Sequence, residues 1–128
     1  MFQTRHDVVI LTASGTGGLE AAVANTLSPG DKVVRATMGS FGDRFGQIAR
    51  IFGADVTMLS FDPGTAVVPE VLRQTLNGDP EIKAVLVTHN ETNTGVTNDL
   101  EAISQVVKGE FDKLLVVDAV SSLGCIPL

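Results

Sequence analysis

The residues best suited to chemistry stand where a short apolar run, residues 8–13, passes into a helix expected at 19–27. The connecting segment is Ser14-Gly15-Thr16-Gly17-Gly18. Small residues let an anion approach the backbone, and the first N–H groups of a helix lack partners within it. The segment therefore predicts a phosphate cradle. Its glycines have neither the dinucleotide-binding spacing nor that of a nucleotide P-loop, so an ordinary glycine-rich turn is an equal alternative.

Three further positions follow later apolar runs. Phe41 lies in a glycine-flanked loop at 38–44, Thr92 lies in a hydroxyl-rich loop at 89–95, and Asp118 follows four apolar residues. A carboxylate placed there is costly to bury unless it is paired, and a protonated pyridine nitrogen would pair it. Capping of the next turn explains Asp118 equally well. Pyridoxal phosphate is one ligand that could use the cradle, the aromatic face, the hydroxyl and the acid together.

The elements that must position these residues alternate between strand and helix. Continuous apolar runs predict buried strands at 8–13, 32–37, 55–61, 84–88 and 114–117, and helical spacing or caps predict helices between them. This order indicates an α/β fold, a three-layer αβα arrangement around a mainly parallel sheet. Functional residues in such sheets lie beyond the carboxyl ends of the strands, where these polar positions fall.

The bulk properties narrow the function classes. The chain has 128 residues and a formal net charge of −6, and its nine basic residues are scattered, which argues against nucleic acid or an anionic membrane as partner. No apolar run approaches the length of a membrane span. The single cysteine, Cys125, fits a cytoplasmic location and is expected to be a core residue. The sequence contains no cluster of His or Cys residues, so it predicts no metal site.

Six stretches, in order along nearly the whole chain, together form a recognisable pattern. They are Phe2-Gln3-Thr4-Arg5, Ser14-Gly15-Thr16 with Leu19-Glu20-Ala21, Pro29-Gly30-Asp31, Gly39-Ser40-Phe41-Gly42-Asp43-Arg44, Thr88-His89-Asn90-Glu91-Thr92-Asn93-Thr94-Gly95 and Val117-Asp118-Ala119-Val120-Ser121-Ser122-Leu123-Gly124. With these stretches the sequence resembles the class V aminotransferases, which are pyridoxal-phosphate enzymes of fold type I. The similarity is strongest to the alanine–glyoxylate and serine–pyruvate aminotransferase branch.

The resemblance implies cofactor contacts at six positions. Ser14, Gly15 and Thr16 match the phosphate-binding segment, Phe41 the aromatic that stacks on the ring, Thr92 the residue that binds the phenolic oxygen, and Asp118 the partner of the pyridine nitrogen. His89 belongs to a loop motif and is expected to organise that loop. Related cysteine desulfurases carry a histidine where Phe41 stands, which weighs against that branch.

The same resemblance implies a larger protein. Residues 1–128 match a partial large, cofactor-binding domain, without the Schiff-base lysine region or the C-terminal domain; Lys32, Lys83, Lys108 and Lys113 match no part of the lysine motif. The implied reaction moves an amino group from alanine or serine to a 2-oxo acid such as glyoxylate or pyruvate, in a homodimer. The chain alone contains no catalytic residue and is expected to be inactive.

Two alternatives stay open at this point. One is another class V enzyme, a lyase or a desulfurase. The other is a non-catalytic α/β module that binds a phosphorylated ligand.

The family's sheet order, 3-2-4-5-6-7-1, has a further implication. Strands 6 and 7 match nothing in this sequence, so we expect a core of four strands. The first strand, residues 8–13, would then be displaced, re-paired or given to a dimer.

Overall fold

The structure is a computed structural model and describes residues 4–126. Its helices are α1 (Gly15–Thr26), α2 (Ser40–Ile51), α3 (Pro69–Gly78), α4 (Leu100–Ser104) and the π-helical turn η1 (Gln105–Glu110). Its strands are β1 (Lys32–Thr37), β2 (Asp55–Ser60), β3 (Ile82–Thr88), β4 (Asn90–Glu91), β5 (Val96–Thr97) and β6 (Leu114–Asp118). Four of the five predicted strands are present, each within two residues of its predicted bounds.

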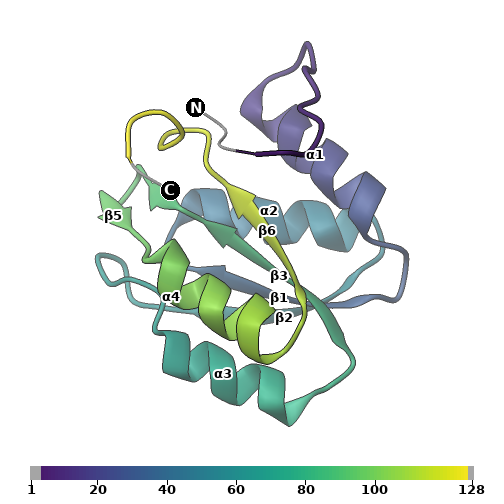
Figure 1. The fold of residues 1–128 in the computed structure, drawn as a ribbon, viewed down its shortest axis with the longest axis vertical. Coiled ribbons are helices and arrows are strands. Elements are labelled where there is room, and N and C mark those ends of the chain that lie inside the picture. The colour runs from purple at the N-terminus through teal and green to yellow at the C-terminus, as the bar shows by residue number, and fades with distance from the viewer. Residues whose placement is uncertain (1–3, 127–128) are drawn as a thin grey trace.

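Those four strands form one parallel sheet in the order β2-β1-β3-β6 (Figure 1). The central strands are buried on both faces: Val33, Val34 and Ala36 of β1 are inaccessible to solvent. Burial on both faces explains why the strands read as continuous apolar runs. The order equals the 3-2-4-5 part of the sheet that the resemblance implies, so the four-strand core is confirmed.

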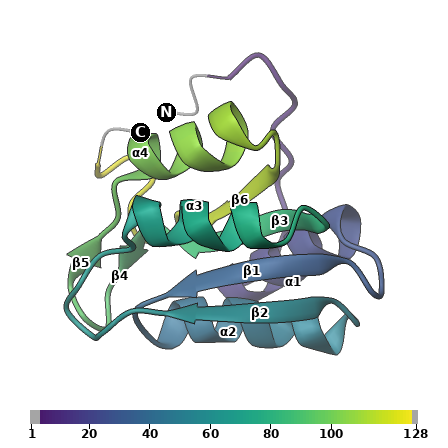
Figure 2. The ribbon, with the colours of Figure 1, turned by 90° about the horizontal axis from the view of Figure 1, so that it is seen from below.

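Helices cover both faces of the sheet (Figure 2). On one face α1 and α2 pack through Leu19, Val23, Phe45, Ile48 and Ala49. On the other face α3, α4 and η1 pack through apolar residues that include Leu72, Leu76, Ile103, Val106 and Val107. The predicted three-layer αβα arrangement is therefore confirmed. Within residues 4–126, no helix combines the length and the apolar character needed to cross a membrane.

Two helices begin earlier than the sequence predicts. The helix expected from residue 19 begins at Gly15, and Phe41, expected in a loop at 38–44, lies in the first turn of α2. Glycine is unfavourable inside helices, so the sequence predicted loops at these first turns, which contain Gly17, Gly18 and Gly42. Both the predicted cradle and the predicted aromatic thus stand at helix N-termini.

The predicted strand at residues 8–13 is wrong. The structure assigns no strand there, and Val8, Val9, Ile10 and Leu11 are between 50% and 92% exposed. An apolar run becomes a buried strand only when a neighbouring strand pairs with it and a layer covers it. Within residues 4–126 no strand pairs with this segment, so it is displaced from the sheet.

The expectation for Cys125 is also wrong, because its side chain is exposed. The loop after β6 instead buries Ser122, whose N–H donates to the carbonyl of Ala119 at 3.1 Å. Proximity to Leu123 and Ile126 in sequence did not predict which side of this tight loop faces the core. Of the resembling stretch at 2–5, the first two residues lie outside the described part of the chain.

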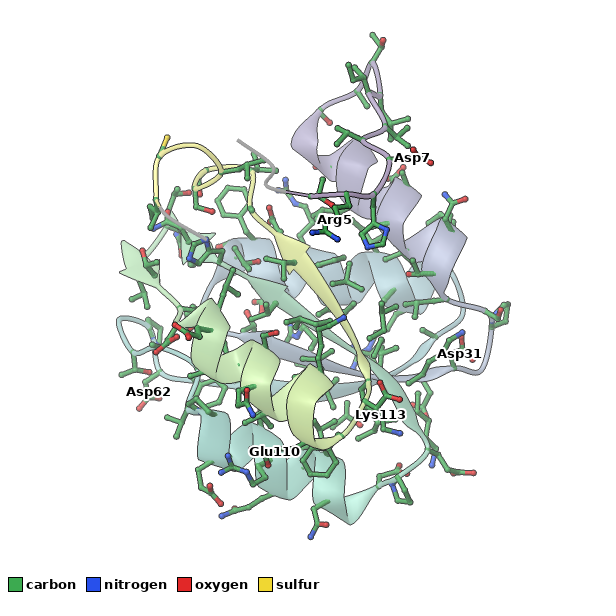
Figure 3. The ribbon with its side chains drawn as sticks, viewed as in Figure 1. Arg5, Asp7, Asp31, Asp62, Glu110 and Lys113 are labelled. Carbon is green, nitrogen blue, oxygen red and sulfur yellow. The ribbon has the colours of Figure 1, made fainter. Side chains whose placement is uncertain are left out.

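Charged pairs gather at the amino ends of the strands. Lys32 contacts Asp79 at 2.9 Å, and Lys83 contacts Asp31 at 2.5 Å; Figure 3 labels Asp31 and Lys113 at this end of the sheet. The hydrogen bond from Lys83 lowers the pKa of Asp31, and the bond from Lys32 lowers the pKa of Asp79. Exposed pairs of this kind contribute little stability each. The opposite end of the sheet holds the candidate site.

Candidate active site

A pocket of about 250 Å³ lies beyond the carboxyl ends of β3 and β6, beside the N-termini of α1 and α2. This volume is close to the lower end of the range for small-molecule sites, roughly 300–1,000 Å³. All six positions singled out from the sequence line it. The lining residues are Ser14, Gly15, Thr16, Leu19, Phe41, Arg44, Asn90, Thr92, Asp118, Val120 and Ser121.

The first wall of the pocket is the N-terminus of α1. Ser14 is the N-cap residue, with an extended backbone, and its hydroxyl makes no capping bond. The hydroxyl and the first helical N–H groups are therefore available to an anion, which the helix dipole also favours. Gly15 allows close approach here: a Cβ on it would lie 3.1 Å from Cγ2 of Val120.

The second wall is the first turn of α2. Phe41 is 38% exposed, and the guanidinium carbon of Arg44 lies 5.7 Å from the centroid of its ring, within cation–π range. Arg44 Nη1 also donates to Thr16 Oγ1 at 3.4 Å, which links α2 to α1. The sequence did not single out Arg44. Its i+3 spacing from Phe41 is a signal only if the helix is known to begin at Ser40.

Asp118 ends β6 at the floor of the pocket. The residue is 7% exposed, and Oδ1 accepts the N–H of Val120 at 3.0 Å. No ion pair of Asp118 occurs within residues 4–126. Both interpretations of this residue therefore agree with the geometry: the carboxylate caps the following turn, and it also faces a cavity in which a cationic group could pair with it.

The third wall comes from the β4–β5 hairpin and the loop after β6. Thr92 is exposed in the hairpin turn. Next to it, Asn90 Nδ2 donates to Thr97 Oγ1 at 2.8 Å, and Ser121 Oγ donates to the Asn90 carbonyl at 3.0 Å. Asn90 and Ser121 fall in the resembling stretches, but no residue-type pattern in the sequence assigned either of them a role.

His89 lies behind the pocket and is not part of its lining. It is 4% exposed, its Nδ1 lies 2.8 Å from Ser122 Oγ, and its backbone N–H donates to the Asp118 carbonyl at 2.8 Å. Burial lowers the pKa of His89, which favours the neutral ring. This is the arrangement expected of a residue that holds two loops together.

The parallel sheet, the two helical layers and the pocket at the strand ends define a domain of the fold-type I pyridoxal-phosphate enzymes. The family model described as Aminotransferase class-V matches residues 1–128, and the chain belongs to that family.

Three proteins illustrate the similarity. A soluble hydrogenase small subunit from Synechococcus sp. (strain PCC 6716) is 45% identical over 98% of this chain and 33% of its own length. A serine–glyoxylate aminotransferase from Methylorubrum extorquens is 41% identical over 97% of this chain and 32% of its own. The crystal structure of an alanine–glyoxylate aminotransferase from Nostoc sp. superposes with a TM-score of 0.86, at 36% identity, over 92% of this chain and 31% of its own.

The chain thus spans about one third of the length of the curated relatives that it matches.

Proposed function

We propose that residues 1–128 form part of the cofactor-binding domain of a pyridoxal-phosphate-dependent aminotransferase. The amino donor would be a small amino acid, alanine or serine, and the acceptor a 2-oxo acid such as glyoxylate or pyruvate. The observation that carries the proposal is the convergence of the six positions on one pocket in a class V chain. Relatives named for serine or alanine as the donor, with glyoxylate, support the substrate class.

The residues present fit the cofactor. A Cβ at position 15 would fill the space beside the cradle, and the Ser14 hydroxyl makes no capping hydrogen bond. The pocket also contains the aromatic ring of Phe41 and the buried carboxylate of Asp118. When bound, pyridoxal phosphate supplies an electron-withdrawing pyridine ring. Ser14, Gly15 and Thr16 would bind its phosphate.

The other three positions would act on the ring. Phe41 would hold one face of it and exclude water there, and Thr92 would donate to its phenolic oxygen. The Asp118 carboxylate would hold a proton on its nitrogen. Asp118 can do this while Oδ1 still accepts the Val120 N–H, because a carboxylate has two oxygens.

The Schiff-base lysine is proposed to lie in a segment of the protein outside residues 1–128. None of the residues that line the pocket within the described chain is a lysine. Residues 1–128 alone are therefore proposed to be inactive, since the covalent anchor and proton shuttle would be missing. The complete protein is proposed to be a cytoplasmic homodimer.

The test uses the protein expressed from the complete reading frame that contains residues 1–128. We expect it to bind pyridoxal phosphate, with the visible absorption of a bound cofactor, and to convert glyoxylate to glycine with alanine or serine. The Asp118→Asn variant keeps an oxygen for the Val120 N–H but removes the charge, and should lose at least about a hundredfold in turnover, the low end of what removing one electrostatic contact to a reacting group costs. Asp99→Asn, at the N-cap of α4, is the matched control.

Other results would overturn the proposal in defined ways. Elimination from serine, or release of sulfur from cysteine, without amino transfer would indicate another class V enzyme. Binding of phosphate esters without any aldehyde chemistry would indicate a binding module. Turnover by residues 1–128 alone would refute the proposed place of the lysine.

A further inference from the structure

Glu91 is the most deeply buried ionisable residue of the described chain, and it lies next to the pocket without lining it. Its side chain is inaccessible to solvent. Its carboxylate accepts backbone N–H groups from α2: Oε2 accepts from Phe41 at 3.1 Å and from Gly42 at 3.2 Å. A buried carboxylate needs such partners, because an unpaired charge would be far more costly.

The contact supplies a helix cap that the local sequence lacks. The N-cap residue of α2 is Gly39, which has no side chain to accept the first N–H groups. Glu91, which follows Phe41 by fifty residues, provides the acceptor and places a negative charge at the positive end of the helix dipole. Gly39 also makes the space, since a Cβ there would lie 2.6 Å from Cδ of Glu91.

The backbone of Glu91 is fixed in the β4–β5 hairpin, which forms another wall of the pocket. Glu91 pairs with Val96 in the β4–β5 hairpin, and its carbonyl accepts the N–H groups of Thr94 at 3.1 Å and Gly95 at 2.8 Å. Thr92 stands in the turn that these bonds close. One residue therefore joins the hairpin that carries Thr92 to the helical turn that carries Phe41, and both of these side chains line the pocket.

We propose that Glu91 is a positioning residue, which fixes the Phe41 ring and Thr92 relative to one another and so orients a ring that stacks on Phe41 and accepts a hydrogen bond from Thr92. This inference rests on the proposed function, because the ring is that of pyridoxal phosphate. Glu91 acts through Phe41 and Thr92 and touches no ligand itself. A structural cap alone would stabilise α2 without controlling how a ligand is oriented in the pocket.

The test compares Glu91→Ala and Glu91→Gln with Asp99→Ala in the complete protein, prepared free of cofactor. Asp99 is the matched control because its carboxylate also caps a helix, accepting the Ala102 N–H at 2.9 Å, but away from the pocket. Three quantities are measured: the melting temperature, the dissociation constant for pyridoxal phosphate, and the circular dichroism that the bound cofactor shows per mole.

Glu91→Ala should weaken cofactor binding about tenfold and change the induced circular dichroism, because the Phe41 stack and the Thr92 hydrogen bond both lose their orientation. A tenfold change corresponds to about 1.4 kcal/mol, which the partial loss of a stacking contact and of a hydrogen bond together can supply. Glu91→Gln keeps one acceptor oxygen and nearly the same shape, so about a threefold loss is expected. Asp99→Ala should lower the melting temperature but leave binding within about twofold of wild type.

If both Glu91 variants melt earlier yet bind the cofactor like wild type with unchanged dichroism, Glu91 is only a cap and the inference is wrong. If Glu91→Ala does not fold, the nearly isosteric Glu91→Gln decides by the same two readouts. If the wild-type protein does not bind pyridoxal phosphate, the proposed function fails and this inference fails with it. If the wild-type protein binds pyridoxal phosphate and both Glu91 variants bind it equally well, the proposed function stands and only this inference is refuted.

Discussion

Replacing Gly39 with alanine should destabilise the protein through one contact. The Gly39 backbone has φ near 179°, an extended conformation that alanine adopts without strain. The new Cβ would nevertheless lie 2.6 Å from both Cδ and Cγ of Glu91. Glu91 is fully buried, and its carboxylate accepts hydrogen bonds from the backbone N–H groups of Phe41 and Gly42, so its side chain has no free space into which to move.

The expected cost combines two effects. Overpacking a well-packed site costs about 1–3 kcal/mol, and displacing a buried hydrogen-bonding group costs about 1–3 kcal/mol. We expect about 3 kcal/mol in the free energy of unfolding, because the two effects partly replace one another. This is a large part of the roughly 5–15 kcal/mol that stabilises a typical domain.

A double-mutant cycle isolates the contact. The cycle compares Gly39→Ala, Glu91→Ala and the double variant by urea unfolding, followed by far-ultraviolet circular dichroism. Glu91→Ala removes the atoms that the new Cβ at position 39 would meet, so the double variant should be no less stable than Glu91→Ala alone. The coupling energy should then be about the full 3 kcal/mol estimated from overpacking and bond loss.

Gly78→Ala is the control, because a Cβ at Gly78, the last residue of α3, would meet nothing within 4 Å. It should be neutral or slightly stabilising. If Gly39→Ala unfolds like wild type, or if the two substitutions at Gly39 and Glu91 are simply additive, the steric argument is refuted.

Asn98→Ala should cost about 2–3 kcal/mol in urea unfolding, because Asn98 is buried, donates to the Thr88 carbonyl and accepts the Val67 N–H; the exposed Asn93→Ala should cost nothing measurable. Phe41→Ala should weaken binding of pyridoxal phosphate about three- to tenfold by titration, the worth of an aromatic stack; equal affinity would exclude ring contact. Burial holds the pKa of His89 below its unfolded value of 6.5, so the unfolded state takes up this proton first: the stability that depends on a neutral His89 is fully present above pH 6.5 and falls as the pH drops below that value. Urea midpoints should show this slope and lose it in His89→Gln.

The sheet was predictable because its signals are local. The central strands β1 and β3 are runs of residues buried on both faces, and such runs leave a continuous apolar pattern. The helix starts were not predictable in the same way. The cap of α2 comes from Glu91, which is about fifty residues away from the N–H groups that it accepts. The sequence near Ser40 therefore contains no capping residue that would predict the start of the helix.

In the segment at 8–13, by contrast, a clear local pattern predicted a strand that the structure does not contain. Its apolar pattern is that of a buried strand, but a pattern specifies only what a segment could bury, not whether a neighbour is present to bury it. The six site positions lie on one pocket because the carboxyl ends of parallel strands meet at one edge. Arg44, Asn90 and Ser121 were missed because their place in that pocket depends on helix phase and loop geometry.

The walls of the pocket come from segments that begin at residue 14 and end at residue 121. These segments meet only where β1, β3 and β6 lie in one sheet, so the cavity exists only in the assembled domain. A ligand bound there stabilises only the fully assembled state. At a hundred times its dissociation constant it would add about 2.7 kcal/mol to global stability. The slowest-exchanging amides of the central strands, far from any contact with the ligand, would therefore exchange more slowly still.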